Sequence, residues 1–145
     1  MAARGKSSAG MPAKEDLEAM SIFRYQLRRF LRFSEEVVRD EGVTTLQYQL
    51  MLHVRGFEGR EWATVGELAE RLQAAPHGTV ALVSRCETSG LVERRASRAD
   101  RRQVEVHLTA KGEQCLARLA SLHKSEIEAF GWVFDRQPGQ DESEG

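Results

Sequence analysis

The segment from Thr64 to Thr109 constrains the fold most, because it holds two short helical patterns close together and then a strand pattern. The first helix begins at Thr64, with Glu67 three residues later, a spacing typical of a capping box. Its expected inner face consists of Leu68, Ala69 and Leu72. After a turn at residues 73–75, Pro76 suits the first position of a second helix, where its missing N–H costs nothing. That helix is expected to extend to about Ser89, with Val80, Leu82, Val83 and Cys86 facing the core.

A β-hairpin is predicted directly after the second helix. One strand begins at Leu91 and Val92, and the other alternates apolar with polar residues, as half-buried strands do; its apolar members are Val104, Val106 and Leu108. Antiparallel pairing makes Arg94–Arg102 the turn and places residues 97–100 at the tip. This order predicts a helix-turn-helix followed by a hairpin wing.

Apolar helices are predicted on both sides of this segment. The first, residues 14–39, carries apolar residues at three- and four-residue steps: Leu17, Met20, Leu27, Phe30, Leu31, Phe33, Val37 and Val38. Ile22, Phe23 and Tyr25 widen that surface, which indicates a core helix, a dimer interface or both. The last helix, capped by Thr109, presents Cys115, Leu116, Leu119, Leu122, Ile127 and Phe130, extended by Trp132, Val133 and Phe134.

A further short helix and a loop connect the first long helix to the central segment. Gly42 is expected to end the helix of residues 14–39, and Thr44 with Gln47 forms a second capping-box pattern. The apolar face of the helix that follows is Leu46, Leu50, Met51 and Val54, and it ends near Arg55. Residues 57–62 are expected to be a loop, with Trp62 packed at the junction.

The predicted fold class is mainly α with a small β-hairpin wing. We expect a winged helix-turn-helix over about residues 44–109, flanked by N- and C-terminal dimerisation helices over about 14–40 and 109–135. These parts form one domain over residues 14–135, with disordered tails at 1–13 and 136–145. Apolar helical regions at both ends favour a homodimer.

Composition narrows the class of protein. Hydrophobic residues make up 41% of the chain and charged residues 30%, and no apolar run approaches the roughly 20 residues that a membrane span needs. The first residues lack the apolar region of a secretory signal, so the cytoplasm is the expected location and no membrane partner is expected. Two cysteines far apart form neither a disulfide framework nor a metal motif.

Charge distribution points to nucleic acid, although the net charge is only −1. Five arginines and one aspartate lie between Arg94 and Arg102. Arginines at a hairpin tip can enter the narrow, negative minor groove. We therefore predict DNA contacts from Arg98, Arg101 and Arg102, with the Asp100 carboxylate bracing the Arg102 guanidinium and fixing the turn.

The second helix of the central pair has an outer face that suits the major groove. Its predicted DNA-contacting residues are His77, Gly78, Thr79, Ala81 and Arg85, with Ser84 also outward. Glycine in a helix costs about 1 kcal/mol relative to alanine, and close approach of the backbone to a phosphate would offset this. Alternatively, Gly78 only eases the turn into the helix.

These motifs resemble the MarR family of winged-helix transcription regulators over nearly the whole chain, from about Asp16 to Phe130. The resemblance is strongest in GELAERL (66–72), TVALVSRCETSGLVERR (79–95) and ADRRQVEVHLTAKGE (99–113). Asp100, Arg102, Leu108, Thr109 and Gly112 match the family's wing signature, whereas Ser97 stands where the family often has aspartate. Ala75, His77 and Gly78 replace Ser/Thr residues common at the start of the recognition helix.

The resemblance implies a homodimer that binds double-stranded DNA at a palindromic or near-palindromic operator and usually represses transcription. It also implies a small phenolic or aromatic effector in many members, or oxidant sensing through a cysteine in some. Tyr25, Tyr48 and Trp62 are aromatic candidates for an effector pocket, although each is equally compatible with plain packing.

Other functions are weaker hypotheses. Cys86 and Cys115 lie on apolar stripes, which favours core packing over oxidant sensing. His53, His77, His107 and His123 are scattered, so neither a metal site nor any other cofactor is expected. The chain shows no arrangement of catalytic residues and is not expected to be an enzyme. A winged helix used only for protein contacts remains an alternative, but it would not explain arginines clustered at a hairpin tip.

Overall fold

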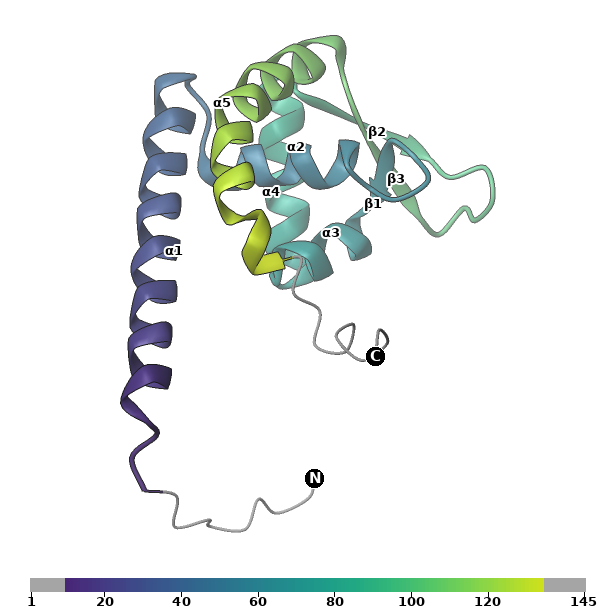
Figure 1. Ribbon diagram of the computed structural model, residues 1–145. Helices are drawn as coiled ribbons and strands as arrows, with labels where there is room; N and C mark the ends of the chain where they lie inside the picture. Colours follow the sequence, from purple (N-terminus) through teal and green to yellow (C-terminus); the bar gives the residue numbers. More distant parts are fainter. Residues whose placement is uncertain (1–9, 135–145) are drawn as a thin grey trace, which may run out of the picture. The chain divides into compact units, whose positions relative to one another are not determined.

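The computed structural model describes residues 10–134 of the 145-residue chain, with side-chain surroundings described to Lys124 and at Glu128. The elements are α1 (Lys14–Asp40), α2 (Thr45–Arg55), β1 (Trp62–Thr64), α3 (Val65–Leu72), α4 (Pro76–Thr88), β2 (Val92–Ala96), β3 (Val104–Leu108) and α5 (Ala110–Phe134) (Figure 1). They belong to two compact units, residues 1–33 and 34–145. Most of the predicted tails, and the side chains predicted on α5 from Ile127 onward, lie outside the described residues.

The predicted helix starts are confirmed, and side chains fix two of them. Thr44 Oγ1 accepts the Gln47 N–H at 3.1 Å, and the Gln47 side chain accepts the Thr44 N–H at 3.0 Å. The same reciprocal pair joins Thr64 and Glu67 at 3.2 and 2.9 Å. These bonds satisfy backbone N–H groups that have no partner inside a helix. Pro76 begins α4, as its missing N–H predicts.

The sheet contains a strand that the sequence did not predict. Trp62–Thr64, expected as the end of a loop and a helix cap, forms β1 and pairs antiparallel with β3, Trp62 opposite His107 and Thr64 opposite Glu105. The sheet order is β1-β3-β2. Three residues between a glycine-containing loop and a helix cap are too few to show alternation, which is why the pattern gave no signal.

One hydrophobic core fills the second unit, centred on α2 and shared by α3, α4, α5 and the sheet. Its fully buried members include Leu50, Met51, Val54, Leu68, Val83, Cys86, Val106 and Leu119. The prediction that Val80 faces the core is wrong, because it is 46% exposed; Leu46 and Leu122, predicted on the apolar faces of their helices, are 52% and 48% exposed. On α4 the inward face is Thr79, Leu82, Val83 and Cys86, so Val80 lies beyond its edge.

A polar contact is enclosed in this core. His123 of α5 is 2% exposed, and its Nε2 lies 2.8 Å from the Ser34 hydroxyl. Its Nδ1 lies 2.6 Å from the Leu119 carbonyl oxygen, and its ring stacks on Tyr48 with centroids 4.7 Å apart. Burial raises the pKa of Tyr48. The contact joins the last part of α1 to α2 and α5 within the second unit.

The chain turns sharply where α4, the hairpin and α5 meet. The Leu91 N–H donates to the Cys86 carbonyl at 2.9 Å, and the Leu91 carbonyl accepts the Thr109 N–H at 3.0 Å. The Thr109 hydroxyl donates to the Gly90 carbonyl and accepts the Gly112 N–H at 3.1 Å, which confirms Thr109 as the cap of α5. A Cβ on Gly112 would lie 2.0 Å from the Leu91 carbonyl oxygen, so only glycine fits there.

The first unit is a single helical stretch of α1 with apolar side chains on several sides. Within residues 10–33, Met20, Ile22, Phe23, Tyr25 and Leu31 are between 43% and 59% exposed. One helix cannot bury such a surface against itself, and contiguous exposed apolar side chains of this kind typically mark an interaction surface.

Replacing Gly112 with alanine is expected to destabilise the protein by at least about 1–3 kcal/mol, the usual effect of forcing an extra carbon into a packed site. Chemical denaturation followed by circular dichroism measures this difference. Gly66→Ala is the matched control, because a Cβ at that exposed helical glycine meets nothing within 4 Å. Equal stability of the two variants would contradict the packing argument.

Candidate nucleic-acid interface

Helices α3 and α4 form the helix pair, and the outer face of α4 is the part of it that could enter a DNA groove. His77, Gly78, Ala81, Ser84 and Arg85 are all exposed, as the sequence predicts. Thr79 was predicted to lie on this outer face, and that prediction is wrong. Its side chain is 1% exposed, and its hydroxyl donates to the Ala75 carbonyl at 3.0 Å. A buried hydroxyl with its donor bound inside the helix cannot contact a base, so Thr79 is a core residue.

Arg94 attaches the first strand of the hairpin to α4. Its guanidinium donates to the Ser84 hydroxyl at 2.8 Å, to the Val80 carbonyl at 3.3 Å and to the Glu87 carboxylate at 3.0 Å. Its backbone N–H donates to the same carboxylate at 3.1 Å. The sequence pattern assigned Arg94 to the turn, but β2 continues to Ala96 and makes this arginine a structural clamp.

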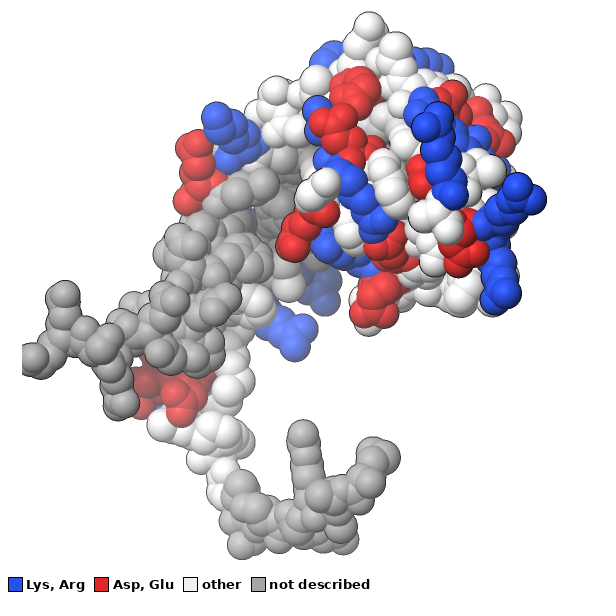
Figure 2. Space-filling view, turned by 90° about the vertical axis from the view of Figure 1, so that its right-hand side faces the viewer, with Lys and Arg blue, Asp and Glu red and all other residues white. Residues whose placement is uncertain are grey.

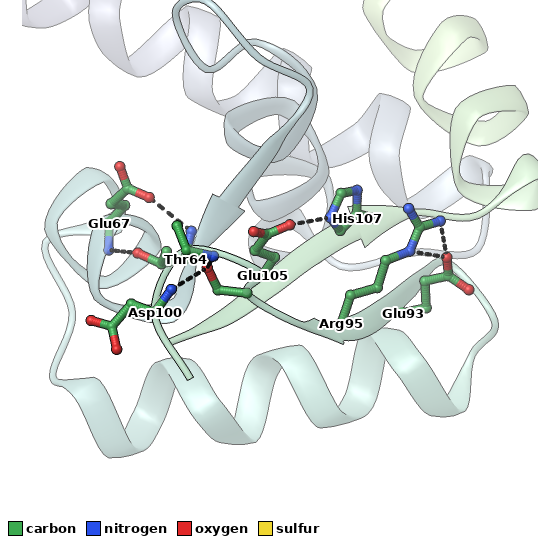
Figure 3. Close-up of polar contacts among 9 residues, drawn as sticks. Thr64, Glu67, Glu93, Arg95, Asp100, Glu105 and His107 are labelled. Carbon is green, nitrogen blue, oxygen red and sulfur yellow. Dashed lines mark hydrogen bonds and ion pairs between the residues drawn. The ribbon is translucent and has the colours of Figure 1, made fainter. Parts of the chain in front are cut away.

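The five arginines of the hairpin divide into two groups. Arg94 and Arg95 lie on β2 and are paired, Arg94 with Glu87 and Arg95 with Glu93, whose carboxylate accepts the Arg95 Nε–H at 2.8 Å (Figure 3). Arg98, Arg101 and Arg102, here called the tip arginines, are exposed. Among the described residues their guanidinium groups have no hydrogen bond or ion pair. The positive charge available to a partner is therefore concentrated at the tip.

Ser97 and Asp100 shape that tip. The buried Ser97 hydroxyl accepts the backbone N–H groups of Ala99 and Asp100 at 3.3 and 3.2 Å. The Asp100 carboxylate accepts the backbone N–H of Arg102 at 3.0 Å. The predicted brace therefore fixes the turn, but it does so through the Arg102 backbone, and no ion pair between these side chains exists in the described part of the chain. The Arg102 guanidinium stays available.

The other edge of the sheet is held by contacts that the sequence did not reveal. Arg60 stacks over the rings of Phe57 and Trp62, 4.2 and 4.0 Å from their centroids, and pairs with Glu67. Burial alone would raise the pKa of Glu67, but hydrogen bonds from Thr64 and the Arg60 charge lower it instead. Trp62 thus packs at the junction, as predicted; it begins the unpredicted strand β1, and its partners are Arg60 of the preceding loop and His107 of β3.

His107 and Glu105 lie side by side on β3. The His107 Nε2 is 2.9 Å from the Glu105 carboxylate (Figure 3), and the His107 ring stacks on Trp62 with centroids 6.0 Å apart. Both side chains are only about one-sixth exposed, at 16% and 15%. These contacts hold the base of the hairpin, while its tip extends away from the helices (Figure 1).

Charges of both signs alternate on the side of the second unit from which the hairpin extends (Figure 2). Glu87 and Glu93 form ion pairs with Arg94 and Arg95. Such a surface is not a broad basic patch. Local positive charge at the hairpin tip, rather than net charge, is what an anionic partner would meet.

Comparison with known proteins finds similarity to one family of regulators. A family model described as "MarR family" matches residues 41–103, the part that contains α2, the helix pair and β2. The HTH-type transcriptional regulator YsmB of Bacillus subtilis is 30% identical over 96 residues, which cover 62% of this chain and 65% of YsmB, just under two thirds of its length. The structure of AbsC, a MarR family transcriptional regulator from Streptomyces coelicolor, aligns with a TM-score of 0.71 at 18% identity, over 90% of this chain and 86% of AbsC. Residues 41–103 are thus similar to the MarR family, and the chain has the fold of a MarR-family structure.

A third relative is known with nucleic acid. The structure of the S. aureus MepR F27L mutant bound to an oligodeoxyribonucleotide aligns with a TM-score of 0.62 at 16% identity, over 83% of this chain and 85% of MepR. MarR-family members are transcriptional regulators and not enzymes, which agrees with the prediction that this chain is not an enzyme. The match over residues 41–103 and the shared fold agree with the resemblance found in the sequence.

The two cysteines are buried, as predicted. Cys86 is 0% and Cys115 4% exposed. Burial raises the pKa of the Cys86 thiol to about 11, against a small opposing effect of Arg85, and burial also raises the pKa of Cys115. Reactive cysteines are exposed thiolates with a lowered pKa. Neither side chain has the properties of an oxidant sensor.

Metal and effector sites are not evident in the described part of the chain. There, no group of three or more His, Cys, Asp or Glu side chains is placed to hold a metal ion, and no helix is long and apolar enough to cross a membrane. Of the aromatic candidates, Tyr48 is buried against His123 and Trp62 is held by Arg60 and His107. Tyr25 is 59% exposed and belongs to the first unit.

Thiol labelling of the native protein at pH 8 is expected to be slow at both cysteines and to become fast only in denaturant. Because the raised pKa belongs to the folded state, the Cys86 contribution to stability is complete below pH 9 and is lost as pH rises toward 11. Cys86→Ala tests this, since it removes that pH dependence. Rapid labelling of either cysteine in the native protein would contradict the conclusion that neither is an oxidant sensor.

Proposed function

We propose that this chain is a sequence-specific DNA-binding transcription regulator that acts as a homodimer. In this proposal α4 is the recognition helix and enters the major groove, while the hairpin tip enters the adjoining minor groove. The observation that carries it is the set of tip arginines, three exposed guanidinium groups with no side-chain partner among the described residues, on a turn that Ser97 and Asp100 hold rigid. The MepR complex supports it as a related fold that binds DNA.

Electrostatics explains why the tip would suit a minor groove. Three positive charges within five residues repel one another, and the fold gives them no carboxylate partner in the described chain. The narrow minor groove concentrates negative potential and attracts inserted arginine. By contrast, Arg94 and Arg95 already pair with carboxylates and would add little to binding.

Replacing Arg102 with alanine is expected to weaken operator binding and to lower the slope of log affinity against log salt by about one for each phosphate that is no longer neutralised. Fluorescence anisotropy at four salt concentrations, on DNA selected from a random library, measures both quantities. Arg95→Ala is the matched control, because that arginine is exposed on the same hairpin but paired with Glu93. Equal salt slopes for the two variants would show that the tip arginines are not part of the DNA interface.

The homodimer is proposed from the apolar surface of the first unit. Burying a large apolar side chain contributes about 1.5–3 kcal/mol, so a partner helix would gain by covering these residues. The terminal helices, residues 14–40 and 109–135, are the proposed dimerisation elements. Leu119, although on α5, is fully buried inside the second unit and belongs to the core.

Replacing Phe23 with glutamate is expected to raise the dimer dissociation constant at least about tenfold, since that corresponds to only about 1.4 kcal/mol. Sedimentation equilibrium measures it. Ser21→Glu introduces the same charge at an exposed polar position two residues away and is the control. If Phe23→Glu remains as tight a dimer as the control, this part of α1 is not the interface.

Control by an effector completes the proposal. We infer that the chain acts in the cytoplasm as a repressor at a near-palindromic operator and releases DNA when a small aromatic molecule binds. Two recognition helices about one turn of DNA apart are sensitive to any change in their separation, which is the physical basis of such control. Loss of operator binding on titration with phenolic acids would be its measurable sign.

A further inference from the structure

The recognition helix presents few polar groups to a groove, because the fold uses most of them. The Thr79 hydroxyl is buried and bound to the Ala75 carbonyl. The Ser84 hydroxyl accepts a hydrogen bond from Arg94 at 2.8 Å. His77 and Arg85 are exposed near the start and middle of the helix, and among the described residues their side chains have no hydrogen bond or ion pair. Apart from Ser84, which Arg94 holds, the exposed surface between them has no polar side chain.

That surface consists of Gly78, Val80 and Ala81. Val80 is 46% exposed, although a β-branched apolar residue gains nothing from solvent on an outer helix face. A Cβ on Gly78 would meet nothing within 4 Å, and its backbone lacks the positive φ that requires glycine. Glycine there costs about 1 kcal/mol relative to alanine. Neither residue type is explained by packing within the described chain.

We propose that Val80 and Ala81 contact the 5-methyl groups of thymines in the major groove. The inference rests on the proposed function and deepens it. Among the base edges exposed in that groove, the thymine methyl is the apolar group, and apolar side chains are its matching contact. Gly78, with no side chain, leaves room for the helix to approach closely, and His77 and Arg85 supply donors on either side.

Arg94 is the residue that positions this apolar surface. Its guanidinium holds the Val80 carbonyl at 3.3 Å and the Ser84 hydroxyl at 2.8 Å, one turn apart on α4. It also pairs with Glu87, one further turn along. Because Arg94 of β2 holds α4 at three successive turns, α4 cannot shift along the groove independently of the hairpin. The methyl contacts and the tip therefore keep a constant spacing.

The test replaces single thymines by deoxyuridine, which keeps every hydrogen-bonding group and removes the methyl. With DNA selected by the wild-type protein, removal of a contacted methyl is expected to weaken binding about fourfold, the equivalent of one methyl-sized group left unburied. Val80→Ala should lose this sensitivity at the thymine that Val80 contacts and keep it at a thymine that Ala81 contacts. Leu52→Ala, at a residue 40% exposed on α2, should keep the wild-type preference.

Two failures can be told apart. If selection yields no preferred DNA, the proposed function is overturned. If selection yields an operator but no deoxyuridine substitution weakens binding, or Val80→Ala remains as sensitive as wild type, the methyl contact is overturned while the DNA-binding function stands. Circular dichroism of Val80→Ala checks that the variant is folded, as expected for an exposed position.

Discussion

The close contact between Gly112 and the Leu91 carbonyl sets the geometry of the second unit. Leu91 hydrogen-bonds backward to the end of α4 and forward to Thr109, so one residue joins α4, both ends of the hairpin and the start of α5. Any side chain at position 112 would force the first turn of α5 away from this peptide. The dense packing of protein interiors makes such a junction stiff.

Stiffness at this junction has a consequence for regulation. The first turn of α5 cannot rotate without moving Leu91, and Leu91 cannot move without disturbing the end of α4. Farther along α5, the buried His123 contacts Ser34 and Tyr48 through a hydrogen bond and ring stacking. Ser34, Tyr48 and His123 are thus linked to α4 through packed, hydrogen-bonded elements of the second unit. Such continuous packing lets a displacement at one element reach another.

The sequence predicted most of the fold because local rules determine it. Two capping boxes, Pro76 at a helix start and the alternation at 104–108 depend on spacing alone. Strand β1 was missed because its pairing with β3 is long-range and only three residues long. Val80 was misplaced because apolar character was taken to mean burial, whereas one helical turn admits only one inward face.

The candidate site was less predictable because it depends on which partners the fold supplies. Five arginines in nine residues look equivalent in sequence, yet Glu87 and Glu93 neutralise two of them and leave three at the tip. Thr79 was expected to face outward because it lies near the helix start, but its side chain is buried in the core. Asp100 was assigned correctly as the residue that fixes the turn, but its acceptor role toward a backbone N–H could not be distinguished from a side-chain ion pair.

This division of residues separates affinity from specificity. Arginine contacts to phosphates and the minor groove release counterions, so their contribution falls as salt rises. Contacts between apolar side chains and thymine methyls involve no charge and are nearly independent of salt. Arg94 ties the two surfaces together, so in the proposed complex the tip would hold the protein on DNA of many sequences and α4 would distinguish among them. Raising the salt concentration should then weaken binding to every sequence by a similar factor and leave the discrimination made by α4 almost unchanged.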